Sequence, residues 1–204
     1  MSRPIEIVEV GPRDGLQNER ALLEIDQKLG NHADVTRHRG NIAELYRHKG
    51  AYQQALAYYD QTIPTLRAVG AKYYLAWQLI QKAEVLFLCQ RYAEARTLNA
   101  EGLAMALAWS GDKSDILAAQ VLAAKLRAVA GEVAQACADL EALLAASADA
   151  ERALFLYTLW QLRGAESDHQ AALKLYKSVY ASSSNIHDKH RLNALLAGEP
   201  GGAG

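Results

Sequence analysis

The sequence predicts an all-α fold, a solenoid of stacked helix pairs, and three observations support this prediction. Ala and Leu are abundant, whereas only 4 Pro and 2 Phe occur among the 204 residues, a composition that favours helices. Glycine turns recur at Gly30, Gly70 and Gly111, at spacings of 40 and 41 residues. A fixed period of this length indicates a repeat architecture. Alanine also recurs at one place in four consecutive segments, at Ala55, Ala95, Ala136 and Ala172.

Residues 1–19 differ from the rest of the chain. A β-branched run from Ile5 to Val10 is followed by a break at Gly11 and Pro12, which predicts a strand and then a loop. No partner strand is predicted downstream, so we expect this segment to be disordered, to dock on the solenoid or to pair with another molecule. Residues 20–30 are predicted as a half repeat, the end of a second helix whose own first helix is missing.

Four helix pairs are predicted between residues 33 and 181. Apolar residues recur within each segment at spacings of three and four, and a glycine or a polar break separates successive segments. Pro64 lies inside one predicted helix and is expected to kink it. The predicted pairs are 33–49 with 51–69, 72–89 with 91–109, 114–130 with 132–146, and 149–163 with 168–181.

The solenoid, predicted over residues 20–197, ends with a more polar helix. Asn185 is a suitable N-cap for this helix, which we expect over residues 186–197. Solenoids need such a helix to cover their exposed end. Residues 198–204 are rich in glycine and are predicted to be a flexible tail.

The first complete pair contains the most informative pattern. Between Ile42 and Tyr59 the sequence reads IAELYRHKGAYQQALAYY, in which a small residue and an aromatic precede the Gly50 turn, and another aromatic and Ala55 follow it. This order resembles the tetratricopeptide repeat (TPR). The resemblance implies a right-handed superhelix of TPR-like pairs whose first helices line a concave groove for a protein or peptide partner. The period of roughly 40 residues is similar to that of repeats in bacterial multidomain regulators.

The TPR pattern, carried across the repeats, places the predicted partner-binding groove on the first helices. Its side chains are mostly aromatic and aliphatic with scattered charge, which suits an amphipathic helix or an apolar segment of a partner. The alternative interpretation is that Trp77 and Phe87 pack between neighbouring repeats. The predicted groove residues are Arg37, Glu44, Arg47, Trp77, Ile80, Glu84, Phe87, Val121, Lys125, Ala128, Tyr157 and Gln161.

The N-terminal segment has a second resemblance. The run IVEVGPRDGLQNE, within residues 4–19, is similar to the start of 3-hydroxy-3-methylglutaryl-CoA lyase, where it forms the first strand and catalytic loop of a (β/α)8 barrel. The resemblance implies that Arg13 stabilises an enolate-like product and that Asp14 binds a divalent metal. The other metal ligands and the remaining strands of that family have no counterpart here, and one carboxylate does not hold a catalytic metal. A lyase-related fragment or fusion is therefore the enzymatic alternative.

Charge and motifs narrow the function classes. The formal net charge of −1 gives no basic surplus for nucleic acid or for an anionic membrane. Neither a membrane-spanning stretch nor a secretory signal is present, which predicts a cytoplasmic location. The solenoid lacks nucleotide-binding and nucleophile motifs, so we expect no catalytic residue, cofactor or metal in it. We therefore predict a non-catalytic interaction scaffold. The third hypothesis is a self-associating structural module, a homo-oligomer.

Overall fold

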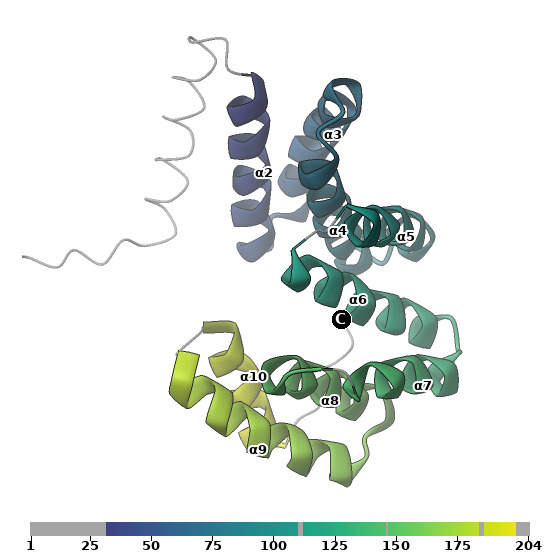
Figure 1. Cartoon of the computed structure of the whole chain (residues 1–204), viewed down its shortest axis with the longest axis vertical. Helices are drawn as coiled ribbons and strands as arrows, with labels where there is room; N and C mark the ends of the chain where they lie inside the picture. Colours follow the sequence, from purple (N-terminus) through teal and green to yellow (C-terminus); the bar gives the residue numbers. More distant parts are fainter. Residues whose placement is uncertain (1–31, 110–111, 146, 184–185, 199–204) are drawn as a thin grey trace, which may run out of the picture.

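The computed structural model describes residues 32–109, 112–145, 147–183 and 186–198, and within them the chain is all-helical. The helices follow one another along the long axis of the molecule, from α2 to α9 (Figure 1). The predicted all-α solenoid is confirmed. The helices are α2 (His32–His48), α3 (Tyr52–Val69), α4 (Lys72–Leu88), α5 (Tyr92–Ala108), α6 (Lys113–Val129), α7 (Val133–Leu144), α8 (Asp149–Arg163), α9 (Glu166–Ser183) and α10 (Ile186–Ala197).

Helix boundaries depart from the expected ranges by at most two residues. Helix α7 ends at Leu144, and α9 already begins at Glu166, because the amide of His169 donates to the carbonyl of Ala165 over 3.2 Å and adds a first turn. Helix α3 continues through Pro64. The lyase-like segment 1–19, the half repeat 20–30, the predicted N-cap Asn185 and the predicted tail 198–204 apart from Gly198 lie outside the described residues.

A left-handed glycine ends α3. Gly70 has φ +69°, and its amide donates to the carbonyl of Arg67 over 3.3 Å. A side chain is strained in this conformation, which explains why glycine follows the last residue of this helix. The next helix, α4, begins two residues later, so the turn between the two pairs is tight.

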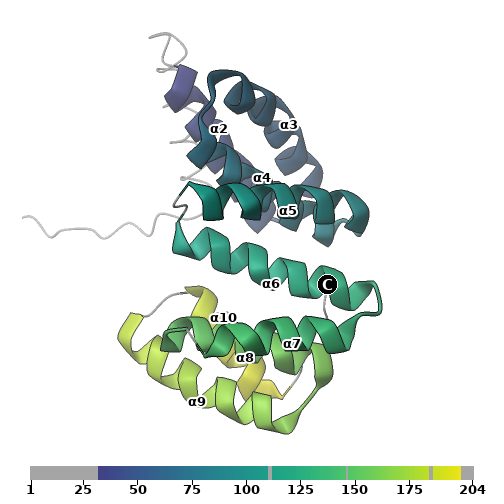
Figure 2. The same ribbon diagram turned by 45° about the vertical axis from the view of Figure 1, so that its right-hand side comes forward.

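The helices form an inner and an outer layer. Helix α4 contacts both α2 and α6, and α6 also contacts α8, so the first helices of successive pairs touch one another. The backbones of the second helices, α3, α5, α7 and α9, do not approach one another in this way in the described part of the chain. Successive pairs are therefore closest on the side of the first helices. The stack is clearest in Figure 2, where α6 lies between α4 and α5 on one side and α7 and α8 on the other.

The aligned alanines lie where two helices of a pair approach closely. Ala55, Ala95, Ala136 and Ala172 have no exposed surface. A methyl side chain at this place lets the two backbones come together, and a larger one would separate them. In the fourth pair the large Trp160 is accommodated by stacking on His169, with 4.6 Å between ring centres. The buried apolar residues form four clusters that follow one another along the described part of the solenoid.

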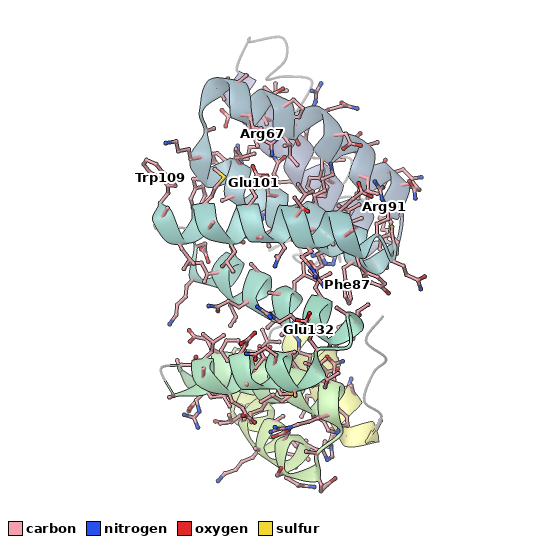
Figure 3. All side chains as sticks on the ribbon, turned by 90° about the vertical axis from the view of Figure 1, so that its right-hand side faces the viewer. Arg67, Phe87, Arg91, Glu101, Trp109 and Glu132 are labelled. Carbon is pink, nitrogen blue, oxygen red and sulfur yellow. The ribbon has the colours of Figure 1, made fainter. Side chains whose placement is uncertain are left out.

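Polar side-chain contacts join successive helix pairs. Arg67 of α3 donates twice to Glu101 of α5, over 2.7 and 2.8 Å, and the pair is labelled in Figure 3. The buried amide of Asn99 donates to the carbonyl of Ala119 over 2.9 Å and so joins α5 to α6. The two contacts join the second helix pair to the first and to the third. The inner helices of the second and third pairs, α4 and α6, flank the candidate site described next.

Candidate partner-binding groove

A cavity of about 370 Å³ opens between α4, α6 and α8, on the side of the first helices. We call it the inner groove. Arg191 of α10 also lines it. The residues that line the inner groove are Ile80, Glu84, Phe87, Leu88, Ser114, Leu117, Ala118, Val121, Leu122, Lys125, Leu154, Tyr157, Thr158, Gln161 and Arg191.

The base of the inner groove is apolar. Ile80, Phe87 and Leu122 are buried and belong to the core, so only a small part of each side chain faces the cavity. Val121 and Leu117 are partly exposed and form the wall on α6. Figure 3 places Phe87 at the level between the α4–α5 pair and α6. The sequence left two interpretations of Phe87 open, as a groove residue or as a residue packed between repeats. In the structure it packs in the core and also lines the inner groove.

Lys125 is the least compensated charge in the inner groove. Its side chain is largely buried, and burial lowers the pKa of its ammonium group, an effect that the nearby Glu84 opposes and Arg191 reinforces. No acidic side chain of the described residues forms an ion pair with it. Glu84 instead pairs with Arg47 over 3.2 Å. A buried ammonium without a partner is unfavourable, and a bound carboxylate would relieve it.

An aromatic cluster supports the wall on α8. Tyr157 makes edge contacts with Trp160 and Tyr176, with ring centres 5.9 and 6.1 Å apart. Burial raises the pKa of the Tyr157 hydroxyl, and Arg191 opposes this rise. These contacts fix the ring of Tyr157 before any partner arrives, so binding here would cost little conformational entropy.

A second hollow, of about 280 Å³, lies between α2, α4 and the start of α6. We call it the aromatic pocket. It shares Ser114 with the inner groove, so the two hollows adjoin on the same side of the molecule. The ring of Trp77 lies against α2 at Gly40, where an added Cβ would come within 2.7 Å of the ring. The aromatic pocket is lined by Arg37, Asn41, Tyr73, Tyr74, Trp77, Asp112, Ser114 and Asp115.

The two aspartates of the aromatic pocket differ in their contacts. Asp112 caps α6, because its carboxylate accepts from the Ser114 amide over 2.7 Å and from the Ser114 hydroxyl. These hydrogen bonds lower the pKa of Asp112. The Asp115 carboxylate forms no ion pair with any described residue. Burial, followed by the charges of Asp112 and Glu44, raises the pKa of Asp115 from 3.8 to about 6.

The twelve predicted groove residues fall into three groups. Seven of them line the inner groove, namely Ile80, Glu84, Phe87, Val121, Lys125, Tyr157 and Gln161. Arg37 and Trp77 line the aromatic pocket instead. Glu44 and Arg47 line neither hollow, although both lie near Glu84 through the ion pairs of Arg47. Ala128 lines neither and packs beside the core cluster of α7 and α8. Partner binding by these residues stays a prediction.

Sequence reasoning missed several lining residues for two different reasons. Leu117 stands four residues before Val121 on α6, so extending the helical spacing from the predicted residue would have found it. Tyr73 and Asp115 lie at the beginnings of α4 and α6, beyond the stretch that the repeat pattern singles out. Arg191 comes from α10, and its place depends on how the last helix packs, for which the sequence carries no local signal.

Residues Arg13 and Asp14, on which the lyase alternative depends, lie outside the described residues. Within the described residues, no three His, Cys, Asp or Glu side chains come together as they would around a metal ion. None of the helices described combines the length and the apolar character needed to cross a membrane.

Comparison with known proteins identifies the fold. The sequence matches no protein-family model, and no curated protein matches it. Among solved structures, the chain is similar to a candidate kinesin light chain from Podosopora anserina with nearly identical TPR-like repeats. The TM-score is 0.59 at 16% sequence identity, and the match covers 91% of this chain and 87% of the other. At this identity the likeness concerns the fold alone. The chain therefore has a helical repeat fold of the TPR-like kind.

Proposed function

We propose that the chain is a non-catalytic scaffold that binds an amphipathic segment of a protein partner in the inner groove. The observation that carries this proposal is the cavity of about 370 Å³ whose walls come from the inner helices of three successive pairs. Solenoids of stacked helix pairs commonly use their concave face to bind other proteins, and the similarity to TPR-like repeats supports the same use here.

The chemistry of the inner groove defines the partner segment. Its apolar base suits two or three aliphatic or aromatic side chains, such as a helix presents at spacings of three and four. Lys125 has no ion-pair partner among the described residues, so an acidic side chain on the segment would compensate its charge. A segment with apolar residues around one Glu or Asp combines both features.

A peptide selection tests the proposal directly. Random dodecapeptides displayed on phage are selected on the intact chain, and the enriched peptides are then titrated against two variants. Val121→Arg places a charge on the wall of the inner groove. Val129→Arg makes the same change on the same helix, at an exposed residue that does not line the groove. Circular dichroism is used to check that both variants are folded.

We expect the selected peptides to be amphipathic and to bind Val129→Arg as they bind the unaltered chain. Val121→Arg should weaken binding about ten-fold or more, which corresponds to about 1.4 kcal/mol. Equal binding to both variants, or a selection that yields no binding peptide, would overturn the proposed function.

A further inference from the structure

The aromatic pocket exposes more aromatic surface than packing requires. The side chains of Tyr73 and Tyr74 are 49% and 37% exposed, and their rings meet edge to face, with centres 5.4 Å apart. Elsewhere in the structure an exposed aromatic ring is covered by a cation: Lys72 Nζ lies 3.6 Å from the ring centre of Trp109. No cation of the described residues covers Tyr73 or Tyr74 in this way. The ring surface that their mutual contact leaves exposed can therefore be contacted by a ligand cation.

The charge in the aromatic pocket is predominantly negative. Asp115 contributes a half-buried carboxylate without an ion pair among the described residues, and the charges of Asp112 and Glu44 act on it. The cation that lines the same pocket, Arg37, lies 3.3 Å from a different carboxylate, that of Asp34. A ligand cation next to Asp115 would compensate its charge and would lie beside the aromatic rings.

We propose that the aromatic pocket binds an arginine side chain of the partner segment, with its guanidinium group stacked on the tyrosine rings and paired with Asp115. Arginine fits better than lysine, because its planar group stacks on aromatic rings and can pair with a carboxylate through two hydrogen bonds at once. The assignment of this cation to a protein segment rests on the proposed function.

The adjacency of the two hollows also defines an orientation for the segment. Ser114 borders both of them, so a segment that fills the inner groove passes the mouth of the aromatic pocket. Asp115 and Lys125 lie on the same helix, ten residues apart, which is about 15 Å along its axis. Their opposite charges require a basic residue near the start of α6 and an acidic residue farther along. A segment bound in the reverse direction would meet like charges.

The first arm of the test uses small probes and the full chain. N-acetyl-arginine amide is titrated into ¹⁵N-labelled protein, and the indole N–H resonance of Trp77, assigned with Trp77→Phe, reports binding. N-acetyl-citrulline amide has the same shape without the charge. We expect the arginine probe to shift this resonance and the citrulline probe to bind at least about five-fold more weakly. No shift, or equal binding of the two probes, overturns the proposal.

Two variants test whether the guanidinium group of the arginine probe pairs with Asp115. Asp115→Asn should weaken binding of the arginine probe about five-fold or more. Asp149→Asn, an equivalent change at an exposed aspartate of α8, should leave its binding unchanged. The comparison of arginine with citrulline on the unaltered chain does not depend on how well a variant folds. Unchanged binding of the arginine probe to Asp115→Asn would contradict the proposed pairing.

The second arm separates this inference from the proposed function. Dodecapeptides selected on the unaltered chain should be enriched in arginine above its frequency in the library, and those selected on Asp115→Asn should not. Selected peptides without this enrichment would leave the scaffold function intact and overturn the arginine site as a partner contact. A selection without any binding peptide would overturn the assignment to a partner segment together with the proposed function, and the probe titration would still decide whether the pocket binds a guanidinium group.

Discussion

Gln78 of α4 joins three helices through a side chain with no exposed surface. Its amide nitrogen donates to the carbonyl of Thr36 on α2 over 3.3 Å, and its amide oxygen accepts from the hydroxyl of Thr62 on α3. Both partners are buried as well. Such a network stabilises only when each member is satisfied, because an unpaired buried polar group loses its contact with water without compensation.

The hydroxyl of Thr62 is therefore expected to contribute to stability. Thr62→Val keeps the shape of the side chain and leaves the amide oxygen of Gln78 without its donor, which should lower the free energy of unfolding by about 1–3 kcal/mol. Urea denaturation measures the change. Thr97→Val is the control, since Thr97 is exposed on α5 and its hydroxyl bonds only the carbonyl of Ala93 in its own helix. Equal losses in the two variants would contradict a role for the buried network.

Asp115 should make stability depend on pH. Burial, with Asp112 and Glu44 nearby, raises the pKa of Asp115 from 3.8 to about 6. The folded chain therefore binds this proton more tightly than the unfolded chain. The contribution of Asp115 is most favourable below about pH 4 and is lost as the pH rises to about 6.

The Asp115→Asn variant lacks this titrating group. The free energy of unfolding of the variant, relative to that of the unaltered chain, should therefore increase with pH between about 4 and 6. The neighbouring charges, Asp112, Glu44 and Arg37, are present in both proteins. Tyr73 stays protonated over this range, because the ordinary tyrosine pKa of 10.0 lies far above it and burial raises the pKa of Tyr73 further. Urea titrations at a series of pH values measure the difference. Parallel curves for the two proteins would contradict the raised pKa.

At the scale of elements, two glycines inside helices show where neighbouring helices approach most closely. A Cβ on Gly40 of α2 would come within 2.6 Å of the Gln78 amide. A Cβ on Gly102 of α5 would lie 2.8 Å from Cγ1 of Ile80 and 3.2 Å from the carbonyl oxygen of Ala76, both on α4. Glycine lowers helix propensity, so its presence at these places reflects packing between helices.

Gly102→Ala should therefore destabilise the chain although alanine is the better helix former. Overpacking costs about 1–3 kcal/mol, against a gain of about 1 kcal/mol in helix propensity. Ala104→Gly, at an exposed residue of the same helix, measures the propensity difference alone. Thermal unfolding of both variants checks the sign. Stabilisation by Gly102→Ala equal to the loss in Ala104→Gly would show that α4 and α5 tolerate the added methyl group.

The sequence predicted the helices better than the contacts between them. Repeat spacing and aligned alanines are local signals, and α4 at Lys72–Leu88 lies within one residue of its predicted range. Close approaches at Gly40 and Gly102 were not predicted, because a glycine inside a helical pattern does not reveal which neighbour lies opposite. For the same reason the sequence did not predict that Trp77 lines a hollow next to the inner groove, with its ring against Gly40.

At the scale of the whole molecule, each helix pair of the described chain contacts only the pairs next to it, and α10 contacts α9. The stability of such a chain is approximately the sum of the stabilities of its repeats and of the interfaces between neighbours. A substitution that destabilises one end should therefore leave the other end unchanged. The C-terminal end depends on α10. Leu195 is buried beside Trp160 and Tyr176, and its carbonyl accepts a hydrogen bond from Nε2 of His169 over 2.7 Å.

Leu195→Ala should therefore loosen the last repeat and leave the first repeats unchanged. Removing this buried side chain should lower the free energy of unfolding by about 2–5 kcal/mol. Hydrogen exchange should show faster exchange in α8, α9 and α10 and unaltered protection in α2 to α5. Leu196→Ala is the matched control, because Leu196 is 60% exposed whereas Leu195 is 1% exposed. A uniform loss of protection along the chain would mean that the solenoid unfolds as one unit. Because Arg191 of α10 lines the inner groove, the proposed function predicts that Leu195→Ala also weakens binding of the selected peptides.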